Sequence, residues 1–521
     1  MSSAAGSNGV TSGLVLDLDG SYIGLTATVD VLLVAGGGGG GTDMGGGGGA
    51  GGVLYTTSSI THGNIYAVVV GAGGAGARAR DVASERGANG ANSTFNGLTA
   101  IGGGGGASFH DQAGYPAGSG GSGGGASGGA QAPSGGSGGA GGYGGGAAGT
   151  GTAGQGYAGS FGIWAWYPGG GGGAAGVGST NPANGGPGIC YPTMSPYYFG
   201  GGGGGSGYSV QQGGTGGIGG GGGGALGDTG VAGKGGQGGG SALNAGVNGS
   251  RGPNNAWANV PGGSAGANTG GGGGGGSHYN SNNAGGAGGS GIVIIRYLGR
   301  QRATGGVVSS LNGYTIHTFL TDGTFDTTAW IDTSGNGNTG TLVNGPTYSS
   351  ANGGSIVLDG TNDRVHVTNN SGLGYNGPIT LIAWVNGTGG MVMSSGVAYG
   401  LFSEGTIRYW YWSANPNWIN YSTTSSVIPN NTWTHIAVSH TPGTSTLPAF
   451  YANGISIASS GSTPTPLNAG SGSSLTIGEY NGYQPYSPYN GKIAQAQVYN
   501  RALSAAEVKQ NFNAYRARFG I

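Results

Sequence analysis

Glycine is concentrated in the first three fifths of this 521-residue chain, and this clustering limits the possible folds more than any other feature. Of the 138 glycines, 109 lie in residues 1–300 and 29 in residues 301–521. Glycine loses more backbone entropy on ordering than any other residue, so glycine runs are typical of flexible linkers or of backbones that pack very closely. With only 19 prolines and no strict Gly-X-Y period, the chain is not collagen. The runs of five or more glycines occupy residues 36–41, 45–49, 102–106, 169–173, 200–205, 219–224 and 270–276.

The borders of the glycine-rich region favour the packed alternative over a linker. Residues 29–34 (Val-Asp-Val-Leu-Leu-Val) lead into it and residues 291–297 (Gly-Ile-Val-Ile-Ile-Arg-Tyr) lead out, and both predict β-strands. A linker does not need matched strands at its two ends. Polyproline II helices have three residues per turn and no internal hydrogen bonds, and glycine allows several of them to pack side by side. We therefore expect a polyproline II bundle bordered by β-strands.

The same residues carry a resemblance. The glycine runs at 36–41, 45–49 and 102–106, with Val-Asp-Val-Leu-Leu-Val before them and Gly-Ile-Val-Ile-Ile-Arg-Tyr after the last run, resemble the glycine-rich domain of bacteriophage tail fibres and related virion proteins. The expected bundle is similar to the tip adhesin of T-even-like phage fibres and to the glycine-rich antifreeze protein of snow fleas. In those adhesins, loops between glycine runs contact the host receptor.

Two segments between glycine runs are rich in aromatic residues and proline. Exposed tryptophan and tyrosine suit contacts with protein or with sugar rings. The alternative is that they cap the bundle or pack against another subunit. The candidate contact residues are Trp164, Trp166, Tyr167, Tyr191, Tyr197, Tyr198 and Phe199.

The region after residue 326 has the pattern of a globular β-domain. Short alternating segments separated by turn residues predict an antiparallel jelly-roll sandwich. Examples are 355–367, 379–385, 431–440 and 450–455. Ser504 and Glu507 form a capping-box pattern that predicts a short helix through about Tyr515. The fold class is therefore mainly β: an antiparallel jelly-roll sandwich plus a glycine-rich polyproline II helix bundle with bordering β-strands.

This region also resembles a known family. Leu-Asp-Gly-Thr-Asn-Asp (358–363), Asn-Thr-Trp-Thr-His-Ile-Ala (431–437) and the segment 491–508 resemble laminin-G-like, concanavalin A-like jelly rolls, and the ending 511–521 looks like that of such domains in cyanophage virion proteins. Residues 13–19 look like the first strand of the same jelly roll. We therefore expect three units: 1–24 as a discontinuous first strand, 25–326 as the glycine-rich polyproline II domain, inserted in the jelly roll, and 327–521 as the jelly roll.

Aromatic residues mark two further candidate surfaces in the jelly roll. Alternation along residues 408–412 places Tyr409 and Tyr411 on one face of a strand and Trp410 and Trp412 on the other. One pair should be core, and the other is free to stack on a sugar ring or to pack on the inserted unit. The candidates for contact with a glycan, a receptor or another subunit are Trp410, Trp412, Trp418, Tyr483 and Tyr486.

The sequence contains no pattern that predicts catalysis. A glycosidase needs two facing carboxylates, and the Glu-x-Asp-x-x-Glu strand of jelly-roll glycosidases does not occur. We expect no enzymatic activity and no cofactor. Asp359 and Asp363 are weak candidates for Ca²⁺ ligands, although turn-forming hydrogen bonds of Asp side chains explain them equally well. His435 lies in an expected core strand, where a structural role is favoured over a ligand role.

Charge and targeting patterns restrict the partners. A net charge of −1 gives no electrostatic reason to bind nucleic acid, and no apolar run approaches the roughly 20 residues that cross a bilayer. No secretory signal is expected at residues 1–9. The leading hypothesis is a phage virion fibre or appendage protein, made in the host cytoplasm and extracellular after release, that attaches to a bacterial surface glycan or protein. Other virion proteins and further copies of the chain, a homotrimer by analogy with fibres, are the expected assembly partners. The alternative is a purely structural subunit of a virion decoration layer or an extracellular filament.

Overall fold

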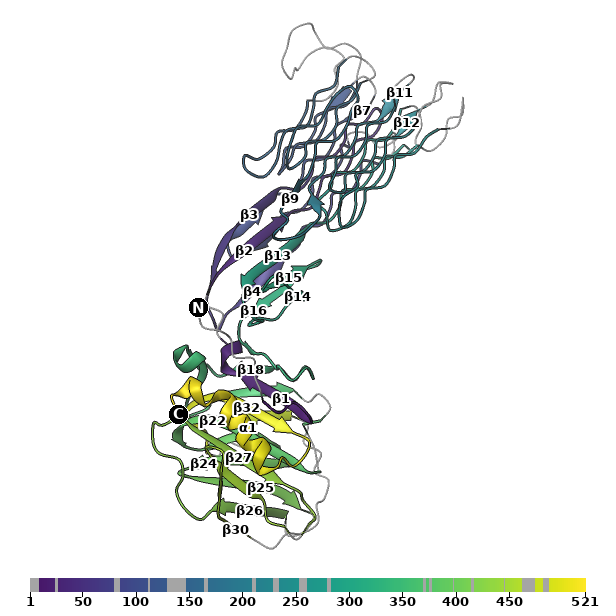
Figure 1. Ribbon diagram of the computed structural model, residues 1–521. Helices are drawn as coiled ribbons and strands as arrows, with labels where there is room; N and C mark the ends of the chain where they lie inside the picture. Colours follow the sequence, from purple (N-terminus) through teal and green to yellow (C-terminus); the bar gives the residue numbers. More distant parts are fainter. Residues whose placement is uncertain are drawn as a thin grey trace.

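The computed structural model has three parts arranged along one long axis (Figure 1): a glycine-rich bundle, a small β-sandwich and a jelly roll. Nearly all regular structure is β, and the large sheets are antiparallel, whereas one two-stranded pair in the bundle is parallel. The described residues are 9–23, 27–78, 85–110, 113–128, 147–163, 167–208, 212–227, 234–252, 260–278, 283–368, 372–373, 377–396, 398–413, 417–444, 446–461, 474–480 and 487–521.

The jelly roll consists of two packed sheets. Its core includes fully buried side chains from both, such as Leu381, Val438 and Ile493 from one sheet and Leu401 and Ile477 from the other. The first sheet contains β19 (Thr347–Ser349), β20 (Ser355–Asp359), β32 (Asn490–Tyr499), β22 (Ile379–Gly389), β27 (Thr434–His440), β28 (Ala449–Ala452) and β29 (Ile455–Ile457) in that order. The second contains β17 (Ala329–Trp330), β18 (Gly340–Val343), β21 (Arg364–Thr368), β31 (Ser474–Ile477), β23 (Met391–Ser395), β24 (Tyr399–Glu404), β25 (Thr406–Ser413), β26 (Asn417–Thr423) and β30 (Ser459–Gly461).

A strand from the beginning of the chain completes the first of these sheets. β1 (Leu14–Asp19) pairs antiparallel with β32, and Leu16 and Leu18 are fully buried in the jelly-roll core. The buried carboxylate of Asp17 accepts hydrogen bonds from Gln495 (3.0 Å) and Gln497 (3.1 Å) of β32. The chain then leaves this sheet through the short 3-10 helix η1 (Gly20–Tyr22) and returns to the jelly roll at β17.

The middle part is a two-sheet sandwich that connects the bundle to the jelly roll (Figure 1). The two predicted bordering strands are present and pair with each other, because β2 pairs antiparallel with β13. Leu33, Ile295, Phe95 and Phe325 fill the space between the sheets and are fully buried. One sheet has the order β14 (Val307–Leu311), β15 (Tyr314–Phe319), β13 (Ile292–Leu298), β2 (Ala27–Val34), β3 (Val53–Ile60), and the other β16 (Gly323–Asp326), β4 (Ile65–Val69), β5 (Ser93–Phe95), β6 (Leu98–Ala100).

The glycine runs form the expected bundle, and its hydrogen bonds repeat every third residue. In segment 36–41, residues 36 and 39 donate backbone N–H groups to segment 87–91, residues 37 and 40 to segment 285–289, and residues 38 and 41 to segment 46–49, all at 2.8–3.0 Å. The carbonyls follow the same period and accept from segments 102–106, 71–77 and 270–276. Three residues per turn without internal hydrogen bonds is the polyproline II geometry. Segment 36–41 is thus a polyproline II helix surrounded by six others.

Close approach of the backbones explains why the interior residues are glycine. A Cβ atom added at Gly39 would lie 2.0 Å from the carbonyl oxygen of Ala75, and one at Gly40 would lie 2.0 Å from that of Gly274. These contacts are with backbone atoms, which no rotamer change can move. Peripheral segments carry a side chain at each third position, where it points outward; Ala72, Ala75, Thr215, Ile218, Lys234 and Gln237 are exposed in this way.

Short elements complete the structure. Small two-stranded pairs occur in the bundle: β7 (Ser108–His110) with β8 (Ala113–Tyr115), β9 (Ile189–Cys190) with β10 (Tyr198–Phe199), and β11 (Gly207–Tyr208) with β12 (Leu226–Gly227). The predicted capping box is confirmed at α1 (Ala505–Tyr515), where Ser504 and Glu507 each hydrogen-bond the backbone of the other. The 3-10 helices η2 (Ala351–Gly353) and η3 (Arg516–Phe519) lie beside each other at the end of the jelly roll that carries α1.

Candidate functional site

The outer face of the nine-stranded jelly-roll sheet carries a candidate site. Along β25, Tyr409 and Tyr411 point into the core and are each 1% exposed, whereas Arg408 lies on the opposite face, in the wall of a surface hollow. The predicted alternation is confirmed, since Trp410 packs in a separate cluster away from the main core. Among the described residues, no second sheet packs on the face that bears Arg408 and Trp410.

The inward-facing tyrosines surround a buried histidine and have a structural role. The Tyr409 hydroxyl lies 3.3 Å from Nδ1 of His440, and the rings of Tyr411 and Tyr421 lie within 6 Å of the same imidazole. Burial lowers the pKa of His440 to about 4 and raises the pKa of Tyr409 well above its usual value. Both groups therefore remain uncharged near neutral pH. A neutral cluster of this kind fixes the inner side of the sheet while its outer side contacts solvent.

Trp410 does not present the free stacking surface that we expected. It is 5% exposed because its indole lies over Gly400 and packs with Met391 and Phe402, while the ring of Tyr480 stands at 5.8 Å. These neighbours come from the adjacent strand β24, from β23 and from the segment after β31. The prediction that Trp410 contacts a ligand directly is therefore corrected: it supports the outer face from beneath.

A polar hollow of about 470 Å³ lies on this face, over β25, β26 and β30. Arg408 is held in place by Glu404, with 2.9 Å between Nη1 and Oε2, and by the ring of Phe402, 4.5 Å from its guanidinium carbon. Because Glu404 balances the charge of Arg408, the hollow offers mixed donors and acceptors rather than net charge. Such a surface suits a polyhydroxylated ligand. The lining residues are Arg408, Asn420, Tyr421, Ser422, Ser460 and Gly461.

Sequence reasoning missed the polar members of this hollow. The register of β25 and β26 reveals them, because Trp410 pairs with Asn420 and Arg408 pairs with Ser422. Paired residues lie on the same face of a sheet. Ser460 joins through the pairing of β26 with β30, a short strand that no sequence pattern marked. Trp412 and Trp418 pair with each other at the end of β25 and β26, and their side chains lie outside the described residues, as do Tyr483 and Tyr486.

The three glutamate side chains of the jelly roll pair with arginines. Glu479 pairs with Arg364 at 2.8 Å, and Glu507 pairs with Arg501 at 2.6 Å while it caps α1. The ion pair and the cap lower the pKa of Glu507 to about 2. With Glu404 bound to Arg408, each of these three carboxylates has a structural partner. The expectation that the chain is not an enzyme remains a prediction.

The two weak Ca²⁺ candidates lie in a tight turn between β20 and β21. Asp359 accepts the backbone N–H of Thr361 at 2.8 Å, and Asp363 accepts the N–H of Asp359 at 3.1 Å. The backbone hydrogen bond from Thr361 lowers the pKa of Asp359. These are turn-forming hydrogen bonds of Asp side chains. Within the described residues, no three His, Cys, Asp or Glu side chains gather where they could hold a metal ion.

The aromatic segment before Gly200 packs mainly on the middle sandwich. Phe199 is 1% exposed because it covers the second apolar face of the five-stranded sheet with Met194, so its predicted contact with a receptor, a glycan or another subunit is corrected. Tyr191 stacks on Tyr55 of β3, with 4.8 Å between ring centroids. Tyr197 is 40% exposed and stays available for contact.

The remaining aromatic candidates of the bundle are less well defined. Tyr198 is half-buried in β10. Tyr167 is half-buried at a turn of the bundle, where its carbonyl accepts the N–H of Ile163 at 3.0 Å. Trp164 and Trp166 lie outside the described residues.

Comparison with known proteins supports the two-part composition of the chain. Residues 359–509 match the family described as the concanavalin A-like lectin/glucanases superfamily, and residues 22–252 match a family described as a glycine-rich domain. No curated protein matches the chain. Among the described residues, no helix is long and apolar enough to cross a membrane.

Two solved structures illustrate the matches to about a third of this chain. The botulinum neurotoxin serotype D binding domain is 12% identical, with a TM-score of 0.29 over 35% of this chain and 48% of that one, so the chain spans about half of its length. Domain 4 of AbnA, an extracellular arabinanase from Geobacillus stearothermophilus solved with arabinotriose, is 22% identical, with a TM-score of 0.29 over 34% of this chain and 91% of that domain.

Proposed function

We propose that this protein is a non-enzymatic adhesin of a phage virion fibre or appendage, and that its concanavalin A-like domain binds a bacterial surface glycan. The observation that carries the proposal is the polar hollow on the open face of the nine-stranded sheet. Hydroxyl, amide and guanidinium groups converge there above a face that Trp410 and Phe402 make rigid. Lectin sites combine polar groups of this kind with neighbouring aromatic rings.

The chemistry of the hollow indicates a neutral sugar. Asn420 has both a donor and an acceptor on its side chain, and the hydroxyls of Ser422 and Ser460 can each do both. Sugar hydroxyls need such mixed partners. The pairing of Arg408 with Glu404 leaves little net charge to attract an anionic residue.

The bundle suits the role of a stiff tip or spacer. Its backbone hydrogen bonds run between parallel and antiparallel segments in all lateral directions, so bending would break many at once. It lies at the opposite end of the long axis from the jelly roll (Figure 1), which separates two possible contact regions in one chain. Exposed aromatic residues such as Tyr197 add a second candidate contact.

Glycan-array binding and adhesion to bacterial cells test this proposal with the purified chain. We expect Asn420→Ala to reduce glycan binding at least tenfold, about 1.4 kcal/mol, because a buried sugar hydroxyl would lose its partner. Asn430→Ala is the matched control, since Asn430 is exposed on the same domain away from the hollow. Equal losses in both variants, or no binding of any glycan or cell by the unmodified chain, would contradict the proposal.

The alternative is a structural subunit of a virion decoration layer or an extracellular filament. One observation favours it: Ala72, Ala75, Ala88 and Ala91 are exposed on two neighbouring bundle segments, so another copy could approach closely along this row. This alternative expects the purified chain to polymerise and to bind neither cells nor glycans. Electron microscopy of the purified chain separates the two functions.

A further inference from the structure

The edge strand β14 is exposed along its whole length. All five residues are exposed, and Val307 and Leu311 are 64% and 55% exposed. β14 joins β15 through the two-residue turn Asn312-Gly313, where φ is 51° and 80°, as a type I′ turn requires. The residues that flank such a turn exchange hydrogen bonds. By alternation, the backbone N–H and C=O groups of Val308 and Ser310 point away from β15.

β14 has none of the usual protection against pairing with another chain. Edge strands commonly carry a charge, a proline or a covering loop. The sequence Val-Val-Ser-Ser-Leu has neither charge nor proline. At the other edge of the same sheet, the Val53 N–H donates to the Gln155 carbonyl (3.0 Å), and the Asn96 side chain donates to the Ser59 carbonyl (3.1 Å). Two backbone groups at the β3 edge thus have partners within the chain, whereas all five residues at the β14 edge are exposed.

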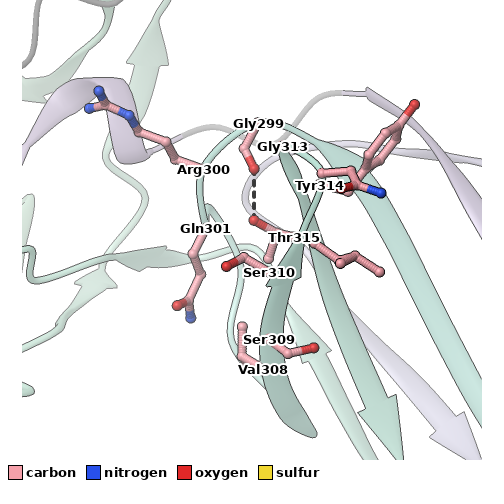
Figure 2. Close-up of a pocket in the computed structure, with 11 residues that line it drawn as sticks. Gly299, Arg300, Gln301, Val308, Ser309, Ser310, Gly313, Tyr314 and Thr315 are labelled. Atoms are coloured by element: carbon pink, nitrogen blue, oxygen red, sulfur yellow. Dashed lines mark hydrogen bonds between the residues drawn. The ribbon is translucent and has the colours of Figure 1, made fainter. Parts of the chain in front are cut away.

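A hollow of about 630 Å³ lies beside β14, between this strand, its turn and the loop 299–301 (Figure 2). The segment from Gly299 to Gln301 forms one wall, and Ser309, Ser310 and Thr315 lie opposite. The Arg300 side chain extends away from these three residues. The Arg300 guanidinium donates to the Tyr22 hydroxyl at 2.7 Å. Among the ion pairs of the described residues, none includes Arg300 or Arg302. Within the described residues, the positive charge of Arg300 beside the hollow is thus not part of an ion pair with a carboxylate.

We propose that β14 binds an extended acidic segment of a partner polypeptide by β-strand addition. The backbone of that segment hydrogen-bonds with Val308 and Ser310, and alternate side chains point toward the hollow, where a carboxylate meets Arg300. A strand needs only about 4.8 Å of space beside β14. The bundle and the jelly roll lie at the two ends of this sheet (Figure 1), and a whole second copy docked side-on would have to fit between them. The site is independent of the glycan hollow.

Fluorescence anisotropy with the full chain tests the chemistry of the segment. The probe is a labelled peptide, Thr-Thr-Glu-Val-Thr-Val-Glu-Thr-Thr, and the comparison is the same peptide with lysine at both glutamate positions. We expect the glutamate peptide to bind at least tenfold more tightly. No binding of this peptide at about 1 mM, or equal binding of both, would overturn the proposal.

Two proline variants test the edge. Val308→Pro removes an outward N–H and leaves the hydrogen bonds to β15 in place, so the fold, followed by its thermal melt, should survive. Thr57→Pro removes an outward N–H from β3 at the other edge, since Thr57 alternates with Val53, and serves as the matched control. We expect Val308→Pro to weaken binding at least tenfold and Thr57→Pro to leave it unchanged. Equal binding by both variants would overturn the proposal. So would a dimer in analytical ultracentrifugation that only Val308→Pro dissociates, because the occupant would then be a second copy.

Discussion

The interior of the bundle consists of hydrogen-bonded backbone, whereas the interior of the jelly roll consists of apolar side chains. In segment 36–41, every backbone group pairs with a neighbouring segment and no side chain separates the helices. In the jelly roll, fully buried tyrosine, tryptophan, leucine and isoleucine side chains separate the two sheets. Atoms added inside the bundle, or removed from the core of the jelly roll, should therefore lower the free energy of unfolding. The two regions should respond to different perturbations.

Removal of β1 should have the largest effect. We propose that the glycine-rich unit is an insertion within the jelly roll, so the fragment 327–521 lacks a strand of its own domain. It would expose β32 and lose the fully buried Leu16 and Leu18, at about 3 kcal/mol each. We expect this fragment to be unfolded or molten by circular dichroism, and a version with residues 9–23 joined through a short linker to fold. A fully stable fragment 327–521 would show that the insertion proposal is wrong.

The second largest expected effect is that acid destabilises the jelly roll through His435. His435 is fully buried between Trp384 and Phe512, and burial lowers its pKa to about 3 from an ordinary value of 6.5. The unfolded chain therefore binds a proton that the folded chain does not, so stability is lost as the pH falls below 6.5. By pH 4 the loss is about 3 kcal/mol from this residue.

Denaturant melts at several pH values measure this effect. Asp17 acts in the opposite direction, because burial raises its pKa to about 6 and its protonation favours the folded state. We expect His435→Leu to flatten the acid limb and Asp17→Asn to steepen it. If His435→Leu leaves the pH dependence of the jelly-roll transition unchanged, the assignment to His435 is wrong.

A single methyl group should destabilise the bundle. Gly39→Ala places a Cβ atom 2.0 Å from the Ala75 carbonyl, and we expect a loss of about 3 kcal/mol in the free energy of unfolding. Gly240→Ala is the matched control, because nothing lies within 4 Å of its added Cβ. Calorimetry should show a lower bundle transition for Gly39→Ala only. Similar melting of the two variants would contradict the close-packed interior.

The smallest expected effect belongs to the cap of α1. Ser504→Ala removes the side-chain oxygen that accepts the Glu507 N–H, and should cost about 1 kcal/mol. A thermal melt of the jelly roll measures the change, and Ser504→Thr should restore most of the stability. A loss above about 3 kcal/mol would mean that Ser504 has a role beyond capping.

The sequence revealed features that depend on local pattern and missed those that depend on distant neighbours. The bordering strands, the glycine runs and the capping box at Ser504 are all visible as patterns of adjacent residues. The burial of Trp410 depends on Met391, Gly400 and Tyr480, and that of Phe199 on the outer face of a sheet formed by β2 and β13. Alternation gives the face of a residue, but not what covers that face. The hollow at Asn420 required the pairing of three strands that only the fold brings together.

The double connection between the jelly roll and the rest of the molecule has a mechanical consequence. The chain crosses between the two parts once after β1 and again before β17. A pulling force on the far end of the bundle is therefore divided between two covalent links, and a twist of one part relative to the other is opposed by both. One of these links begins at β1, which is hydrogen-bonded along β32 within the jelly roll. Extraction of β1 would require its hydrogen bonds with β32 to fail together, so the joint should resist tension better than a single-stranded tether between tandem domains.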